Sequence, residues 1–304
     1  MRTFTFKSLF LTVLFVLLGS TAILAADDGL ITTQVTIKLD EAGTLPNKIS
    51  YDQKNLITNL KIVGEINGTD WNFIREMAGR DFKGEKTDGK LSILDLSEAK
   101  IVAGGDAYAR FSENYYTSND KLGDYAFYGC SGLTSLTLPS SVTSIGDKAF
   151  YSCWMLNSLT IPYSVTSIGD EAFYGCSGLT SLTIPSGVTS IGGYAFYGCS
   201  GLTSIYVYPE NLPELGTDIF NGCNAKNCTV YVPKGTYDAY KSSEFGYFEK
   251  IVEFDASGID KVTTSTNVKE VSRYSANGQR LSAPTKGLNI VKYSDGSVKK
   301  VVVQ

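Results

Sequence analysis

The feature that most constrains this chain is a phenylalanine that recurs at a fixed interval. Phe127, Phe150, Phe173 and Phe196 are each 23 residues apart, and Phe220 follows after 24. Each unit reads A-F-Y-x-C, then L-x-S-L-T-L/I-P, then V-T-S-I-G, with small variations. A unit of this length is too short to bury its own apolar face, whereas stacked copies form one continuous core. The sequence therefore predicts a repeat solenoid.

The motifs within a unit predict its local structure. L-x-x-L-x-L is typical of a short strand with leucines inward and Ser or Thr outward. The proline that follows ends the strand, because it cannot donate a hydrogen bond to a neighbour. V-T-S-I predicts a second short strand or an extended turn. G-D-x-A-F predicts a tight turn or a short helical piece that places the phenylalanine in the core.

These motifs resemble the leucine-rich repeats of the BspA-like surface proteins of Bacteroidetes. The likeness is close over residues 120–254, where four consecutive units carry F-x-x-C, L-x-S-L-T-I-P and V-T-S-I-G or close variants. It implies a leucine-rich repeat solenoid of short strands and turns with a few short helices. It also implies adhesion, since relatives of this family engage host proteins and other bacteria.

The region before the repeats, residues 27–121, is expected to cap the solenoid with irregular repeats. NLKIVGEI (59–66) and KLSILDLSEAKI (90–101) predict strands. TDWNFIREMAG (69–79) predicts a helix capped by Thr69 or Asp70 and ended by Gly79. Residues 102–121 interrupt the repeats with several aromatic residues. They form either a functional loop or a lid that folds back on the core.

Three further segments complete the expected organisation. Residues 1–26 resemble a signal peptide cleaved near Ala25 or Ala26, although an uncleaved membrane anchor is the alternative. We therefore expect a secreted or cell-surface protein on the exterior of the outer membrane, with no transmembrane segment in the mature chain. The repeats and their C-terminal cap span residues 122–254, and T-V-Y-V-P is expected to be the last strand, before a helix from Thr236.

Residues 255–304 predict a small β-sheet domain. Asn277-Gly278 and Asp295-Gly296 are hairpin turn signals between alternating segments. The segment resembles the C-terminal surface-sorting domains of exported Bacteroidetes proteins. It is either a sorting signal or a passive β domain.

Six cysteines in an exported chain raise the question of disulfides. Five of them hold the same repeat slot, namely Cys130, Cys153, Cys176, Cys199 and Cys223. Neighbouring strands at ~4.8 Å would permit bridges by distance alone. Parallel side chains do not converge, however, so we expect this ladder to pack with Phe127, Phe150, Phe173, Phe196 and Phe220 as small buried groups. Cys223 and Cys228 are close enough in sequence for a bridge to remain open, and a zinc site is not expected.

The composition argues against an enzyme. The chain has no histidine, which removes the commonest general base and metal ligand. Asp95, Glu98 and Asp106 are better read as solvated acids than as a glycosidase pair. Residues 27–254 carry 27 acidic and 17 basic residues, a net charge of −10, which argues against nucleic acid. We expect no cofactor.

The outward positions favour binding instead. Tyr128, Tyr151, Tyr174 and Tyr197 each follow a core phenylalanine, and the alternative is that these rings merely cover the edge of the core. Tyr206 shares an outward strand slot with three threonines, and Tyr108, Tyr115 and Tyr116 lie in the interrupting segment. The expected ligand is an extracellular protein or a glycan. A purely structural spacer is the rival function, and the oligomeric state cannot be predicted.

Overall fold

The computed structural model describes residues 29–255 with their side chains and, beyond them, the backbone of strands within 270–303. The predicted signal peptide and the two turn dipeptides at 277–278 and 295–296 lie outside the described residues. The chain divides into two compact units, Met1–Phe254 and Asp255–Gln304. The first unit contains the repeats.

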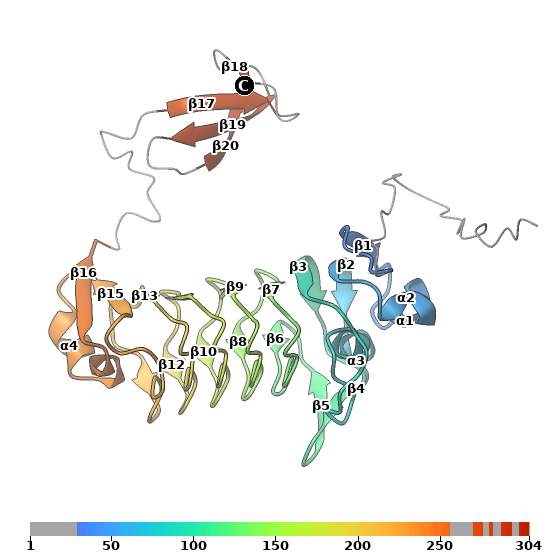
Figure 1. Ribbon diagram of the computed structural model, residues 1–304, viewed down its shortest axis with the longest axis horizontal. Coiled ribbons are helices and arrows are strands. Elements are labelled where there is room, and N and C mark those ends of the chain that lie inside the picture. The colour runs from blue at the N-terminus through green and yellow to red at the C-terminus, as the bar shows by residue number, and fades with distance from the viewer. Residues whose placement is uncertain (1–28, 256–269, 276–279, 282–286, 294–297, 304) are drawn as a thin grey trace, which may run out of the picture. The chain divides into compact units, whose positions relative to one another are not determined.

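The repeats stack side by side, as Figure 1 shows for the turns between β6 and β16. Each leucine motif forms a short strand. These strands are β7 (Ser135–Thr137), β9 (Ser158–Thr160), β11 (Ser181–Ile184) and β13 (Ser204–Val207). β7 with β9 and β11 with β13 pair in parallel, with leucine opposite leucine or isoleucine. The predicted leucine-rich repeat solenoid is confirmed.

The V-T-S-I-G motifs, with the K-L-G and E-L-G segments before and after them, form a second parallel sheet, so that each repeat contributes one leucine strand and one strand of this second sheet. Its members are β6 (Lys121–Leu122), β8 (Ser144–Ile145), β10 (Ser167–Ile168), β12 (Ser190–Ile191) and β14 (Glu214–Leu215). In β8, β10 and β12 the serine faces outward and the isoleucine is buried. The sequence left open whether this motif forms a short strand or an extended turn, and the structure shows that it forms a short strand.

The leucine sheet is interrupted once. Strands β1-β2-β3-β7-β9 form one hydrogen-bonded sheet and β11-β13-β15-β16 another. The interruption follows the repeat that carries Trp154 and Met155 in place of the Ser-Gly pair of the other repeats. In that repeat Leu159 is only partly buried, whereas Leu136 and Leu182 are buried.

The N-terminal region extends the leucine sheet. Strands β1 (Val35–Lys38), β2 (Asn59–Ile66) and β3 (Ile93–Ile101) pair in parallel and lead into β7. Two short helices, α1 (Leu45–Lys48) and α2 (Tyr51–Lys54), precede β2, and α3 (Gly68–Met77) follows it.

The cap of helix α3 lies two or three residues earlier than its sequence suggested. Its N-cap is Asn67, whose side chain accepts from the Thr69 N–H at 3.0 Å, while Asp70 accepts from the Asn67 N–H at 3.0 Å. This reciprocal pair is a capping box. The prediction of Thr69 or Asp70 as the cap is therefore wrong, because Asp70 serves at the third helical position. Gly79 follows the helix with a left-handed φ of +96°, as a terminating glycine does.

Along the phenylalanine turns, the backbone hydrogen bonds between repeats all run one way. The N–H of each core phenylalanine donates to a carbonyl of the following repeat, as from Phe127 to Ala149 and from Phe150 to Ala172, both at 2.7 Å. The corresponding carbonyls of the first repeat would therefore lack donors. The Trp71 indole and the Arg75 guanidinium, both on α3, donate to the Ala126 carbonyl at 3.1 and 3.0 Å. The N-terminal region thus caps the stack with side-chain donors.

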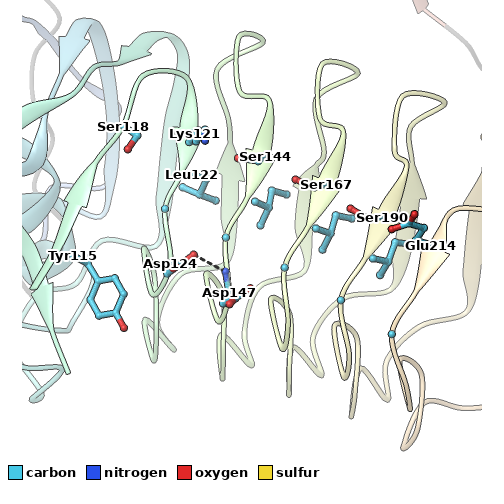
Figure 2. A pocket seen from close by; sticks show the side chains of 18 of the residues that line it. Tyr115, Ser118, Lys121, Leu122, Asp124, Ser144, Asp147, Ser167, Ser190 and Glu214 are labelled. Atoms are coloured by element: carbon cyan, nitrogen blue, oxygen red, sulfur yellow. Dashed lines mark hydrogen bonds between the residues drawn. The ribbon is translucent and has the colours of Figure 1, made fainter. Parts of the chain in front are cut away.

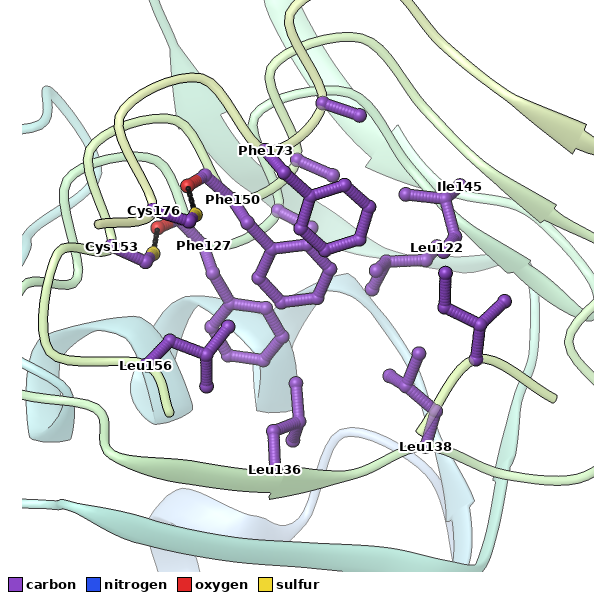
Figure 3. Packing of buried hydrophobic residues seen from close by; sticks show 14 of the residues in the cluster. Leu122, Phe127, Leu136, Leu138, Ile145, Phe150, Cys153, Leu156, Phe173 and Cys176 are labelled. Carbon is purple, nitrogen blue, oxygen red and sulfur yellow. Dashed lines mark hydrogen bonds between the residues drawn. The ribbon is translucent and has the colours of Figure 1, made fainter. Parts of the chain in front are cut away.

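The core is a column of stacked phenylalanines with a row of cysteines beside it, and Figure 3 shows three of the rings with Cys153 and Cys176. Consecutive rings between Phe127 and Phe220 lie 4.9–5.8 Å apart, with interplanar angles between 8 and 15°. Four thiols donate to the phenylalanine carbonyl of the preceding repeat at 3.1–3.2 Å, as Cys153 does to Phe127. The cysteine slot therefore supplies both packing and a directional hydrogen bond.

The C-terminal end of the stack has one strand more than its sequence suggested. T-V-Y-V-P forms β15 (Thr229–Pro233), but β16 (Lys250–Phe254) pairs with it in parallel beyond, so the expectation that β15 is the last strand is wrong. Helix α4 (Tyr237–Lys241) and a 3-10 turn (Glu244–Tyr247) connect the two. Phe245 and Phe248 pack on Phe220 at 5.0 and 5.1 Å and close the core.

The second unit is an antiparallel four-stranded sheet. Its strands are β17 (Glu270–Ser275), β18 (Arg280–Leu281), β19 (Gly287–Tyr293) and β20 (Val298–Val303). Their order in the sheet is β18-β17-β19-β20.

Candidate functional site: the tyrosine row

Four tyrosines line one face of the repeats because each follows a core phenylalanine in its turn. Consecutive rings of Tyr128, Tyr151, Tyr174 and Tyr197 lie 5.0, 4.7 and 4.7 Å apart, with interplanar angles of 14, 9 and 5°. All four are half-buried. We call these four residues the tyrosine row. It ends where Asn221 takes the same slot in the fifth unit.

Stacking determines what the tyrosine row presents to a ligand. Inside the row each ring face lies against the next ring, so the ring edges and hydroxyls are the groups left to meet solvent. Burial raises the pKa of Tyr151, and the neighbouring phenols of Tyr174 and Tyr128 raise it further. That hydroxyl therefore stays protonated at neutral pH and can donate as well as accept. The row is a rigid, uncharged strip with an apolar body and polar tips.

A second row of side chains flanks the first. It holds the residues two positions before each phenylalanine, namely Tyr125, Lys148, Glu171, Tyr194 and Asp218, all with left-handed φ values of 53–57°. Lys148 Nζ lies 3.3 Å from Glu171 Oε1 and 5.8 Å from the centre of the Tyr125 ring. Tyr194 is 40% exposed, and its ring lies 6.0 Å from that of Tyr197. The sequence did not single out this row, because its residue type changes from repeat to repeat.

The interrupting segment 102–121 is a hairpin, β4 (Gly104–Arg110) and β5 (Asn114–Thr117), and its three candidate tyrosines have different fates. Tyr115 is half-buried, and its ring lies 4.8 Å from that of Tyr125, beyond the start of the tyrosine row. Tyr116 is 55% exposed. Tyr108 is 2% exposed and donates its hydroxyl to the Asp124 carbonyl at 2.6 Å.

Placing Tyr108 on a binding surface was therefore wrong. It caps a carbonyl of the first repeat that no preceding repeat can reach, in the same way as Trp71 and Arg75. Two alternatives were expected for this segment. Tyr108 folds back on the core, as the lid alternative expects, whereas Tyr116 is exposed on the surface, as a loop residue would be.

Tyr206 lies away from the tyrosine row, on a strand of the leucine sheet. Its ring stacks on Tyr231 at 4.6 Å and 7°, and Phe254 meets it edge-on at 6.4 Å. Tyr231 and Phe254 come from β15 and β16. Sequence reasoning missed the Phe254 contact because it did not anticipate β16, and it did not align Tyr231 of the predicted strand β15 with Tyr206.

One repeat exposes three further large apolar side chains that sequence reasoning did not select. Trp154, Met155 and Tyr163 are 59, 50 and 63% exposed. The signal was available, since each replaces a Ser or Gly of the neighbouring repeats.

The residues considered for chemistry are engaged in structure. All six cysteines are free and buried, Cys223 and Cys228 included. Burial raises the pKa of Cys130 and Cys228 to about 11 and that of Cys223 to about 12. Burial also holds the pKa of Cys153, Cys176 and Cys199 well above the ordinary thiol value. Such thiols are not ionised at neutral pH and are poor nucleophiles.

The three acids are also paired. Lys61 Nζ lies 3.3 Å from Asp95 Oδ2 and 2.7 Å from Glu98 Oε1. Asp106 accepts from the Thr69 hydroxyl at 3.0 Å. Within the described part of the chain, no three His, Cys, Asp or Glu side chains are grouped to hold a metal ion. None of the helices that the structure describes is long and apolar enough to cross a membrane.

Comparison with known proteins identifies the repeats. Residues 120–244 match the family model described as BspA type Leucine rich repeat region, in six copies. No curated protein gives a significant match.

Several solved structures are similar. A leucine-rich repeat protein of T. pallidum is 30% identical with a TM-score of 0.35, over 41% of this chain and 56% of that one. One from Bacteroides ovatus is 21% identical with a TM-score of 0.34, over 73% and 66%. A leucine-rich cell surface protein from Faecalibacterium prausnitzii is 24% identical with a TM-score of 0.34, over 62% and 53%. The chain thus spans little more than half of the first of these. The family match and the paired parallel sheets together show that the repeat segment of this chain is a leucine-rich repeat array similar to the BspA type.

Proposed function

We propose that this protein is exported, is displayed at or released from the cell surface, and binds an extracellular protein through its repeats. The apolar N-terminal segment with its small-residue end supports export. The BspA-type array supports binding, because solenoids present long, continuous surfaces to macromolecules. A similar array occurs in a protein described as a leucine-rich cell surface protein. Adhesion to host or bacterial macromolecules is the role we assign.

The single observation that carries the proposal is the stacking of the tyrosine row. Amphipathic tyrosines are enriched at protein interfaces because one side chain offers both apolar area and a hydrogen bond. Rings held 4.7–5.0 Å apart by their neighbours have little rotamer freedom left to lose on binding. The ordering cost of ~0.5–1.5 kcal/mol per mobile side chain is therefore largely avoided.

The same stacking favours a protein over a glycan as ligand of the row. A sugar ring binds an aromatic side chain by lying over its face. Inside the row those faces are covered by adjacent rings, and edges and hydroxyls remain. Ring edges and hydroxyls suit a flat, mixed protein surface.

A non-enzymatic role is part of the proposal. The buried thiols have raised pKa values, and two of the three acids considered for catalysis are held by Lys61. Histidine is missing from the sequence. Each of these removes a route to acid–base or nucleophilic catalysis.

Residues 255–304 are proposed to act in surface sorting, after a capping region at 27–121 and the repeats and their cap at 122–254. Deleting 255–304 from the full chain tests this. Loss of surface display with secretion retained supports sorting, whereas unchanged display makes the segment a passive domain.

Alanine substitution of Tyr151, Tyr174 and Tyr197 together tests the binding site. Mature protein, wild type and variant, is titrated over immobilised extracellular-matrix proteins by surface plasmon resonance. We expect the triple variant to lose binding that the wild type shows.

Two controls separate binding from folding. A triple phenylalanine variant keeps the stack and removes only the hydroxyls. The second control replaces Thr137, Thr160 and Thr183 by alanine. It makes the same number of substitutions at outward positions of the leucine strands and leaves the tyrosine row intact. If the tyrosine-to-alanine variant remains folded and binds like the threonine control, the row is not the site, and a spacer role gains support.

A further inference from the structure

An open groove runs along the outer side of the second sheet, with a volume of about 630 Å³ (Figure 2). In the figure the three serines of β8, β10 and β12 follow one another along one side of it, and Asp124 and Asp147 lie on the other. The β4-β5 hairpin contributes Tyr115 and Tyr116 to its lining. No member of the tyrosine row lines it.

The strand register of the second sheet places opposite charges at the two ends of the serine line. Lys121 pairs with Ser144 at one end, and Ser190 pairs with Glu214 at the other. Both charged side chains are exposed, and neither has an ion-pair partner among residues 29–255. The line of serines therefore has a cationic residue at one end and an anionic residue at the other, while the Asp124 and Asp147 carboxylates lie across the groove from it.

The distance between the ends sets the length of a matching ligand. Four strand spacings of ~4.8 Å separate Lys121 from Glu214, which is about 19 Å. A polyproline II helix rises ~3.1 Å per residue and has three residues per turn, so about six residues cover this distance in two turns. Residues six apart then lie on the same side of the helix and can meet both charges.

The spacing of the serines selects this conformation over a β-strand. One polyproline II turn advances ~9.3 Å, close to the ~9.6 Å of two repeats, so its carbonyls can meet alternate serine hydroxyls in register. An extended strand repeats every ~6.7 Å and falls out of register with a ~4.8 Å spacing. The groove also crosses its strands, which already pair with each other, so it offers no free edge for strand addition.

Tyr116 completes the match. Proline-rich segments in this conformation dock against exposed aromatic rings. Tyr116 is 55% exposed at the hairpin end of the groove. Asp124 and Asp147 are committed to the fold, since each accepts the N–H of the following repeat, at 2.9 and 2.8 Å.

We propose that this groove binds a proline-rich peptide in the polyproline II conformation, with an acidic residue at Lys121 and a basic residue six positions away at Glu214. The site goes beyond the proposed function, because it is a second surface with its own ligand class. Substitutions in the groove leave the tyrosine row unchanged. Failure of one proposal is therefore distinguishable from failure of the other.

The test titrates fluorescein-labelled peptides with the mature chain and follows fluorescence anisotropy at low ionic strength. The probe is Glu-(Pro)5-Lys, and its matched control is Glu-(Gly)5-Lys, which keeps the charges and loses the conformation. We expect the proline peptide to bind and the glycine peptide not to bind. Exposed ion pairs contribute modestly, so Lys121→Glu should weaken binding about threefold to tenfold by replacing attraction with repulsion.

A charge swap makes the test sharper. A polyproline II helix can lie in either direction, so the double variant Lys121→Glu with Glu214→Lys should restore binding. Tyr116→Ala should weaken binding, whereas Tyr163→Ala, which removes an equally exposed tyrosine outside the groove, should not.

Three results overturn the proposal. The first is no binding of the proline peptide, or equal binding of the glycine peptide. The second is an affinity for the proline peptide that is the same in wild type, in Lys121→Glu and in the double variant with Glu214→Lys. The third is a panel of neutral oligosaccharides that binds the wild type and loses affinity with Tyr116→Ala, which would make the groove a glycan site.

Discussion

Replacing Gly146 by alanine tests the tight stacking of the repeats on one another. A Cβ at this position would lie 2.3 Å from the Asp124 carboxylate Oδ1, 2.6 Å from the Asp124 nitrogen and 2.7 Å from the Gly123 carbonyl carbon. Ordinary contacts between such atoms are 3.5–4.0 Å or so. Two of the three atoms are backbone and cannot rotate away. The two repeats must therefore move apart by about 1 Å.

The cost can be worked from the contacts at stake. The Gly146 N–H donates to the Leu122 carbonyl at 2.8 Å, and the Asp147 N–H donates to Asp124 at 2.9 Å. Losing the two bonds costs about 1 kcal/mol each. Overpacking adds roughly 1–3 kcal/mol. The sum is about 3–5 kcal/mol, which corresponds to a Tm lower by roughly 6–20 °C for an array of this size.

Gly132→Ala is the matched control. A Cβ at Gly132 meets nothing within 4 Å, and the residue is exposed. Alanine there restricts the unfolded chain and should raise stability by ~0.4–1 kcal/mol. Circular dichroism melts of the two variants and the wild type give the comparison. Equal Tm values for the two alanine variants would refute the stacking argument, because both substitutions add the same methyl group.

Other predictions concern groups with specific partners. All six thiols should resist a thiol reagent in the native chain and react after unfolding, because all six are buried; rapid native reaction of two or more would contradict this. Asp147→Asn should raise Tm at pH 7 and leave it unchanged near pH 3. Burial, with Asp124 and Asp170 nearby, raises the pKa of Asp147, so its ionised form costs stability that protonation restores, and the amide can still accept the Asp170 N–H. A wild type more stable than the variant at pH 7 would reverse that sign. Arg75→Ala should lower stability by about 3 kcal/mol or more, since it opens a cavity and removes donors from the Tyr125 and Ala126 carbonyls; a melt within 1 °C of wild type would contradict the capping role.

The repeated part of the fold could be predicted from the sequence because its signal is redundant. Every unit carries the same motifs for a strand, a proline and a turn. Four aligned copies therefore predict the period, the inward leucines and the parallel pairing. The row of tyrosines was visible for the same reason. Their separation of 4.7–5.0 Å follows from the ~4.8 Å spacing of stacked strands, whereas the near-parallel orientation of the rings is not contained in the sequence pattern.

The ends of the array were less predictable because the sequence of each end occurs only once, with no second copy to align with it. Tyr108 reads as one aromatic among several in a polar segment, and only the fold shows that it reaches the Asp124 carbonyl. K-I-V-E-F at 250–254 lacks the leucine signature, so β16 was missed, and the edge-on contact of Phe254 with Tyr206 was missed with it. Long-range caps depend on which open group they meet, and a local pattern does not contain that information.

The one-way hydrogen bonding of the phenylalanine turns has a consequence for solubility. A stack of this kind is directional, so its first turn offers bare carbonyls and its last turn offers bare N–H groups. Without end groups, the last turn of one molecule could pair with the first turn of the next. Such a head-to-tail contact does not close into a ring, so it would repeat and form a filament. Trp71, Arg75 and Tyr108 occupy the acceptors at one end, and the carboxylate of Glu244 takes the Ile219 N–H at the other. These few side chains act as chain terminators that keep a self-complementary array from polymerising.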